Sequence, residues 1–340
     1  MTNCQKMQRA VQRLTQTLSA AIKFPSGRMV RSAAFSSNVT RSLLVGLFAL
    51  SVTIRCFALD LSPRRWTHLP IGTNFAGIAY AYTEADFFVD PAILLEDVEM
   101  TLDIWAGKYI RTFELFDKSA RIDLTQAHME GEWKGLVNGV PAEVSRSGWS
   151  DTFVRLAVNL YGAPPLHAKA FASYRSELRN ETIVGMALAI RLPTGEYLED
   201  KLINLGQNRF AFRPQLGVVH SHGKWAAEAT GEVAFYMENN DFFNGNILEQ
   251  KPRYSIDLDL VYTFRPGLWV GAGIGYNSGG ENTINGIDKD DKRQNVVWGF
   301  NLSYPFNPYS GISITYIANR TQESVGFDSD TLSVALSVAW

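Results

Sequence analysis

Few side chains in this sequence are of the kinds that catalyse reactions or bind metals. His220 and His222 flank Ser221, which brings a hydroxyl group and two candidate bases together. A serine hydrolase needs its serine beside a histidine that an acid or an amide orients, and no Gly-x-Ser-x-Gly motif occurs in the chain. Two histidines without a third ligand also make a poor metal site. We therefore interpret both histidines as turn residues and predict no catalytic residue, no metal site and no cofactor.

Many of the remaining charged side chains alternate with large apolar ones. In residues 254–264, for example, Asp257 and Asp259 stand between large apolar residues. Successive side chains of a β-strand point to opposite faces, so such a segment has one apolar and one polar face. If the apolar faces meet lipid, the polar faces line the interior of a closed barrel. This phase predicts the following lumen-lining candidates: Glu99, Asp103, Arg121, Asp123, Arg155, Arg191, Arg213, Glu228, Glu232, Asp257, Asp259 and Trp269.

The lumen-lining candidates carry both signs of charge, which leaves two roles open. The acids and arginines either pair with one another across a narrow interior, or some of them contact a passing solute. Trp269 shares its predicted face with Gly271, Gly273 and Gly275. These glycines either open a small channel or let a plug pack closely, and an inward aromatic ring would suit an aromatic solute.

The alternation that positions these residues recurs along the chain. It is clearest at the C-terminus, where every even residue from Leu332 to Trp340 is large and apolar and every odd one is small or polar. A period of two predicts a strand with two unlike faces. We predict twelve such strands, at residues 72–83, 98–115, 119–132, 153–160, 180–191, 208–221, 225–235, 254–264, 268–277, 296–304, 312–319 and 331–340.

The connections between the predicted strands also alternate in length. Short turns follow the second, sixth, eighth and tenth strands, whereas longer connections, such as 133–149, follow every odd strand. This order predicts an all-β fold, an antiparallel transmembrane β-barrel of about twelve strands with both termini periplasmic. The exception is 162–179, in which Pro164-Pro165 precede a predicted short helix that lies in the periplasm, caps the barrel or enters it. Phase slips near Gly107 and Gln126 predict bulges.

Residues 1–58 differ from the rest of the chain in charge. They hold eight of the 32 basic residues and none of the 34 acidic ones, so the remainder carries a net charge of −10. An apolar run at residues 43–50 follows these basic residues, and Cys56-Phe-Ala58 supplies a cleavage site, the order of a secretory signal peptide. We predict a presequence over 1–58, with translation starting at Met1 or Met29, and one barrel domain over 59–340. The negative charge argues against a nucleic-acid partner.

Several Gly- and Pro-containing segments resemble a known family. They are Pro193-Thr-Gly-Glu-Tyr197, Asn204-Leu-Gly-Gln-Asn208, Phe210-Ala-Phe-Arg-Pro214 and Leu160-Tyr-Gly-Ala-Pro-Pro-Leu166. Together they are similar to the MetA-pathway of phenol degradation family, and the resemblance extends over roughly residues 66–340. It implies an outer-membrane transporter. No functional residue is carried over from the family, because its motifs are turn patterns.

The leading functional hypothesis is passive passage of a small, apolar or aromatic solute through a barrel in the bacterial outer membrane. A non-transporting structural or interaction barrel is the alternative, and an outer-membrane hydrolase is less favoured. The expected partners are outer-membrane lipid, the solute, and the barrel-assembly machinery, which would recognise the C-terminal strand ending in Trp340. Aromatic residues near the predicted strand ends, Trp66 and Trp340 among them, either form the interfacial girdles of such a barrel or are present because aromatic residues favour strands.

Overall fold

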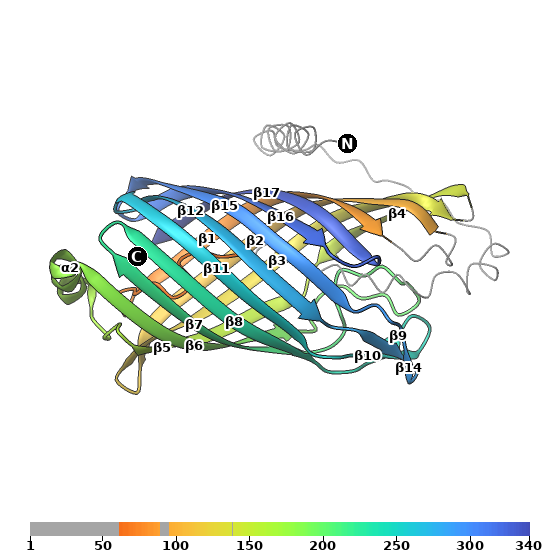
Figure 1. Ribbon diagram of the computed structural model, residues 1–340, viewed down its shortest axis with the longest axis horizontal. Coiled ribbons are helices and arrows are strands. Elements are labelled where there is room, and N and C mark those ends of the chain that lie inside the picture. The colour runs from red at the N-terminus through yellow and green to blue at the C-terminus, as the bar shows by residue number, and fades with distance from the viewer. Residues whose placement is uncertain (1–60, 89–94, 138) are drawn as a thin grey trace.

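The computed structural model describes residues 61–88, 95–137 and 139–340, and the predicted presequence 1–58 lies outside them. Twelve antiparallel strands form a closed barrel (Figure 1). The barrel closes where β1 (Asn74–Phe88) pairs with β17 (Gly326–Ala339). The strands between them are β2 (Leu95–Leu115), β3 (Lys118–Val137), β5 (Thr152–Tyr161), β6 (Asn180–Leu192), β7 (Ala211–His222), β8 (Trp225–Tyr236), β11 (Arg253–Arg265), β12 (Leu268–Gly279), β15 (Arg293–Asn307) and β16 (Ser310–Thr321).

The prediction of an antiparallel barrel of about twelve strands is confirmed, but several connections differ from the prediction. Residues 133–149, predicted as a loop, are mostly strand, because β3 continues to Val137 and pairs there with β4 (Val140–Trp149). The predicted loops 239–251 and 278–292 also contain short strands. These are β9 (Asn239–Phe242), β10 (Asn246–Gln250), β13 (Asn282–Ile284) and β14 (Ile287–Asp288), which form a small separate sheet.

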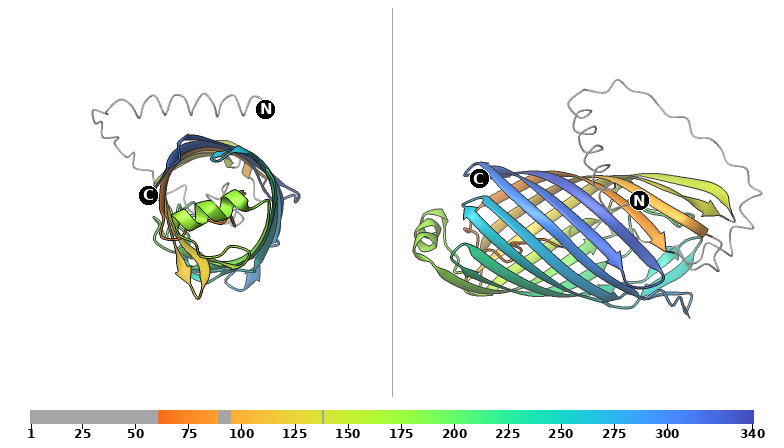
Figure 2. Two further views of the ribbon diagram at one scale, coloured as in Figure 1. Left: turned by 90° about the vertical axis from the view of Figure 1, so that its left-hand side faces the viewer. Right: turned by 45° about the horizontal axis from the view of Figure 1, so that its top comes forward.

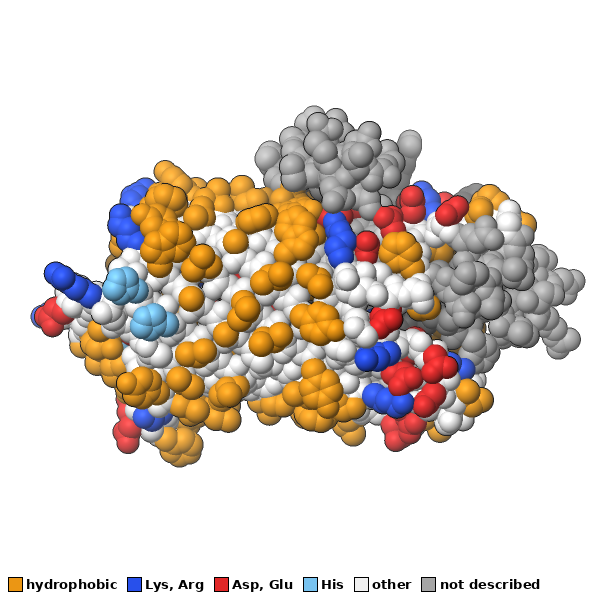
Figure 3. Space-filling view, in the orientation of Figure 1, with side chains coloured by type: hydrophobic (Ala, Val, Ile, Leu, Met, Phe, Trp, Pro, Cys, Tyr) orange, Lys and Arg blue, Asp and Glu red, His pale blue; other side chains and the backbone are white. Residues whose placement is uncertain are grey.

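The outer wall of the barrel is apolar over most of its length. On β11, Ile256, Leu258 and Leu260 are each about half exposed, and they alternate with the buried Asp257 and Asp259. Figure 3 shows apolar side chains over most of one face of the wall, with charged side chains gathered mainly towards its ends. Every barrel strand pairs with a neighbour on both sides, so the backbone polar groups are satisfied within the wall. Among the described residues, no helix has the length and apolar character needed to cross a membrane.

The short turns lie together at one end of the barrel. In the β2–β3 turn, Phe116 and Asp117 both have left-handed backbone angles, with φ of 51° and 58°, as a tight hairpin turn requires. The helix predicted within 162–179 is confirmed as α2 (Ala168–Glu177). Figure 2 shows α2 lying across the barrel opening at this end. Since short turns mark the periplasmic end of outer-membrane barrels, α2 covers the periplasmic mouth.

Candidate functional site

The described residues that precede β1 lie inside the barrel. We call residues 61–73 the inner segment. The guanidinium of Arg64 lies 5.3 Å from the ring centroid of Trp269 on β12, and the backbone N–H of Arg65 donates a hydrogen bond of 3.1 Å to Glu228 on β8. The Arg65 side chain also lies 3.8 Å from the carboxylate of Asp257 on β11. The inner segment is therefore held by the polar inner faces of three neighbouring strands.

Trp66 anchors the inner segment. Its side chain is 1% exposed, and its Nε1–H donates a 2.9 Å hydrogen bond to Thr230. The indole lies against Gly217, where a Cβ atom would be only 1.9 Å from Nε1, so only glycine leaves room for the ring. Arg155 lies 5.0 Å from the indole centroid. The prediction that Trp66 belongs to an interfacial girdle is wrong, because this residue precedes the first strand and turns into the lumen.

His68 connects the inner segment to the connection that contains α2. Its Nε2 lies 2.7 Å from the carbonyl oxygen of Pro164, so this nitrogen donates the hydrogen bond. The imidazole also makes edge contacts with Phe171 and Tyr174 of α2, with centroids 4.9 and 5.5 Å away. The backbone N–H of Ile71 donates to Leu166 in the same connection. The inner segment and α2 together narrow the periplasmic half of the lumen.

Ten of the twelve predicted lumen-lining residues lie on the inner face of the wall. Many of them contact each other: Arg213 and Glu232 form an ion pair at 2.6 Å, and Arg155 lies 3.4 Å from Asp123. Others, such as Glu228, hold the inner segment. The ten are Arg121, Asp123, Arg155, Arg191, Arg213, Glu228, Glu232, Asp257, Asp259 and Trp269.

The placement of Glu99 and Asp103 in the lumen is wrong. Both side chains lie on the outer face of β2, where Glu99 is exposed and Asp103 accepts a hydrogen bond from the Tyr80 hydroxyl. The prediction assumed a phase slip near Gly107, but the β2–β3 ladder has no register shift from Glu99 to Leu115. The even-numbered residues of β2 therefore face inward along this ladder, and those from Val98 to Ala106 are apolar, whereas Lys108, Thr112 and Glu114 nearer the periplasmic end are polar.

This arrangement produces an apolar surface inside the extracellular half of the barrel. We call it the apolar interior patch. Leu102 on β2 and Met129 on β3 lie near its centre and are 1% and 0% exposed. Ile203 and Leu205, from the connection between β6 and β7, pack against it from the lumen side. The patch comprises Ala81, Ala85, Phe87, Val98, Met100, Leu102, Ile104, Ala127, Met129 and Trp133.

The length of the strands explains why the faces invert here. The 21 residues of β2 extend about 70 Å at about 3.3 Å per residue. At a tilt of about 45° they rise about 50 Å along the barrel axis, twice the apolar band of about 25 Å that faces lipid. The extracellular part of the wall therefore meets water on its outside, and its inner face packs against a loop. Sequence alternation alone cannot distinguish this case, because both faces keep the period of two.

The connection 193–210, which we call the inner loop, crosses the interior at this level. Asp151 accepts backbone hydrogen bonds of 3.0 Å from both Gly195 and Gln207, which fixes the two ends of the inner loop to each other. Burial raises the pKa of the Asp151 carboxyl. At the end of the inner loop, Arg209 donates a hydrogen bond of 2.7 Å to Gln250 on β10, and burial lowers the pKa of its guanidinium to about 10. The inner loop thus joins the apolar interior patch to the small separate sheet.

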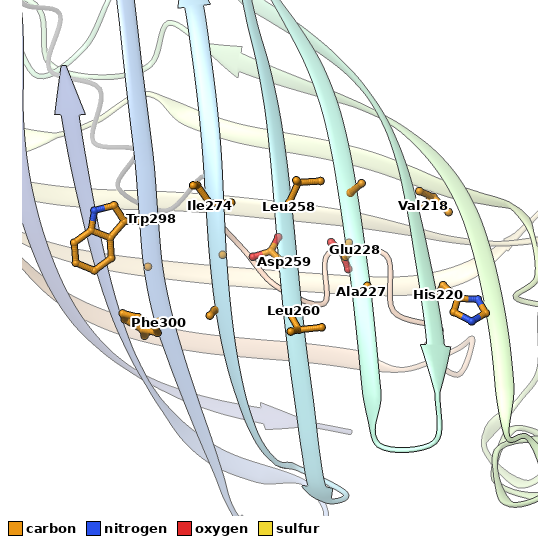
Figure 4. A pocket seen from close by; sticks show the side chains of 14 residues that line it. Val218, His220, Ala227, Glu228, Leu258, Asp259, Leu260, Ile274, Trp298 and Phe300 are labelled. Carbon is orange, nitrogen blue, oxygen red and sulfur yellow. The ribbon is translucent and has the colours of Figure 1, made fainter. Parts of the chain in front are cut away.

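A shallow apolar groove of about 610 Å³ lies on the outer wall over β7, β8, β11, β12 and β15. Figure 4 shows that Leu258, Leu260, Trp298 and Phe300 border it. Alanines and glycines such as Ala272 form its floor, so lipid chains have access to it. Glu228 and Asp259 lie behind this floor on the inner face of the wall.

The His-Ser-His sequence does not form a catalytic pair. His220 and His222 lie on the outer face of β7, where His220 Nδ1 is 2.8 Å from the hydroxyl of Thr182, while Ser221 points to the opposite face. Among the described residues, no group of three or more His, Cys, Asp and Glu side chains is placed to hold a metal ion.

A closed antiparallel barrel with an apolar outer wall, short turns at one end and a polar interior is a bacterial outer-membrane β-barrel. The chain belongs to the MetA-pathway of phenol degradation family, whose model matches residues 84–336. The resemblance found in the sequence is therefore confirmed.

Solved structures with the same fold include an outer membrane channel from Pseudomonas putida F1, which is 20% identical with a TM-score of 0.67 over 83% of this chain and 100% of that one. The transport unit of the autotransporter AIDA-I from Escherichia coli is 10% identical with a TM-score of 0.47, over 85% of this chain and 94% of that one. The CymD monoaromatic hydrocarbon channel is 8% identical with a TM-score of 0.38, over 80% and 89%. At 20% identity, the likeness to the Pseudomonas putida structure shows the fold alone. No curated protein matches the chain.

Proposed function

We propose that this protein lets small apolar or aromatic solutes cross the outer membrane by diffusion, without covalent chemistry or a cofactor. The observation that carries the proposal is the apolar interior patch. Interiors of outer-membrane barrels are normally polar, which suits water and ions. Here the extracellular half offers an apolar solute a surface centred on Leu102 and Met129, both almost fully buried.

The inner loop is the element that such a solute must displace. Ile203 and Leu205 cover the apolar interior patch from the lumen side, so a solute of similar size and polarity can take their place at little cost. Below this level the solute passes the inner segment, where the ring of Trp269 lies beside the guanidinium of Arg64. Two properties of similar proteins agree with this reading: the family description refers to phenol degradation, and the Pseudomonas putida protein is an outer membrane channel.

Uptake by intact cells tests the proposal. Cells that produce the protein should take up radiolabelled toluene faster than cells that lack it, with no comparable gain for arabinose. Met129→Asp should abolish this gain, because it places a carboxylate in the centre of the apolar interior patch. Met237→Asp is the matched control, since Met237 is exposed beyond the end of β8. If wild-type protein increases the uptake of no solute, the barrel is a structural or interaction protein instead.

Two further assignments belong to this proposal. We propose that residues 1–58 direct export and that the barrel begins after them. We also propose that the barrel-assembly machinery binds β17, whose outer face carries the half-exposed Leu336 and Val338 before the exposed Trp340. The hydrolase alternative loses its candidate residues, because Ser221 and its neighbouring histidines face opposite sides of β7.

A further inference from the structure

Five arginines lie on or against the inner surface of the barrel near the level of the inner loop. In the ladders, Arg253 of β11 is opposite Gly279, and Gly279 is opposite Arg293 of β15, so both arginines point inward at one level with only a glycine between them. Arg191 of β6, whose ladder partner on β7 is Ala211, lies three strands from β11 in the wall. We call these five residues the arginine cluster: Arg191, Arg209, Arg213, Arg253 and Arg293.

The members of the arginine cluster are close enough to repel one another. Arg209 is repelled by Arg191 and Arg293, and Arg191 is repelled by Arg213 and Arg253. Like charges held together in a buried place need an opposing charge. Glu232 supplies one by its ion pair with Arg213, Asp151 attracts Arg191, and Asp291 attracts Arg293.

Arg209 has donors left over. Arg209 is 2% exposed, and no carboxylate in the described part of the chain forms an ion pair with it. Its Nη2 donates to the neutral amide of Gln250, and its Nε and Nη1 have no hydrogen-bond acceptor. The ring of Tyr236 lies 5.1 Å from the guanidinium carbon and holds the group in place. A buried guanidinium with two unused donor nitrogens is suited to an anion.

We propose that the arginine cluster binds the carboxylate of an apolar or aromatic acid, with Arg209 as the main contact. The inner loop places this cluster beside the apolar interior patch, because Leu205, which packs on the patch, is only four residues from Arg209. Four residues extend at most about 14 Å. One small molecule therefore has an apolar surface for its body and a cationic site for its carboxylate. The carboxylate site identifies the solute class of the proposed function, so the transport of such an acid rests on that proposal. Binding of the acid to the arginine cluster does not depend on transport.

Calorimetric titration of the folded, detergent-solubilised barrel tests the binding directly. The probes are benzoate and benzyl alcohol, which share a phenyl ring and differ in the anionic group. Benzoate should bind the wild type more tightly than benzyl alcohol does. Arg209→Gln should weaken benzoate binding at least tenfold and leave benzyl alcohol binding unchanged. Arg265→Gln, which removes an exposed arginine at the periplasmic end of β11, is the matched control and should bind benzoate like the wild type.

A second measurement needs no variant, in case Arg209→Gln fails to fold. Raising the chloride concentration should weaken benzoate binding to the wild type, because chloride competes for the same cations, and should not affect benzyl alcohol. Equal binding of benzoate and benzyl alcohol, or benzoate binding that neither Arg209→Gln nor chloride changes, would overturn the inference. If benzoate binds as expected but no solute crosses the membrane, the proposed function fails while the binding site stands.

Discussion

Removing the Trp66 side chain should unseat the inner segment and open the periplasmic half of the barrel. An indole buries about 150–250 Å², worth about 4–6 kcal/mol at about 25 cal/mol per Å². The hydrogen bond from its Nε1–H to Thr230 adds about 1 kcal/mol. Because the freed space is partly refilled, we expect Trp66→Ala to cost about 4 kcal/mol. That loss raises the ratio of withdrawn to seated inner segment by about a thousandfold.

Two measurements report the position of the inner segment. Single-channel conductance in planar bilayers should rise in Trp66→Ala, because the segment no longer occupies the lumen. Trypsin should cut after Arg64 and Arg65 in the variant and spare them in the wild type, since both arginines are held inside the barrel. Trp149→Ala is the matched control, because Trp149 is half exposed outside the lumen.

Gly217→Ala should also unseat the inner segment, by adding an atom where the Trp66 side chain lies instead of removing that side chain. The added Cβ would lie 1.9 Å from Nε1 of Trp66, so the indole must leave its place. Gly231→Ala should be silent, because a Cβ at Gly231 meets nothing within 4 Å. Unchanged conductance together with full trypsin resistance in both Trp66→Ala and Gly217→Ala would refute the reasoning.

The remaining predictions concern the wall and the inner loop. Leu258→Arg places a charge on the lipid face at a cost of about 2–4 kcal/mol near the bilayer midplane, and should block assembly, whereas Ser333→Ala on the inner face should be tolerated. Heat-modifiable migration on gels measures this, and normal migration of Leu258→Arg would contradict the topology. Asp151→Ala removes the acceptor of two backbone hydrogen bonds and should loosen the inner loop by about 3 kcal/mol, seen as faster proteolysis within residues 193–210. Cleavage at the wild-type rate would show that other contacts hold this loop.

The strands could be predicted from the sequence because lipid imposes a strict period of two on them. Each predicted strand overlaps an observed one, and β11 differs from its predicted segment by one residue at each end. β17 begins at Gly326, five residues before the predicted closing strand, because its first residues lie beyond the lipid and carry no apolar pattern on the outer face. The strands hidden in the loops, such as β4, were missed for the same reason.

The interior could be predicted only in part. Alternation places Asp257 or Arg213 on the inner face, but it does not say what fills the lumen. The inner segment has no period of its own, and Trp66 looks like one more interfacial aromatic residue. Two glycines do indicate that something packs there: Gly185 and Gly217 lie on the inner faces of neighbouring strands, where the indole of Trp66 occupies the space of a side chain.

The inversion of β2 is the step that joins the fold to the function. A strand no longer than the membrane is thick would present only its polar inward residues, such as Lys108 and Thr112, and give a polar lumen throughout. Because β2 continues beyond the apolar band of the wall, its outer face must become polar, and its inner face is then free to be apolar. The apolar interior patch exists for that reason, and the inner loop folds onto it through Leu205. The same fold brings Arg209 to the arginine cluster, so strand length sets where an apolar surface and a cationic site meet inside one barrel.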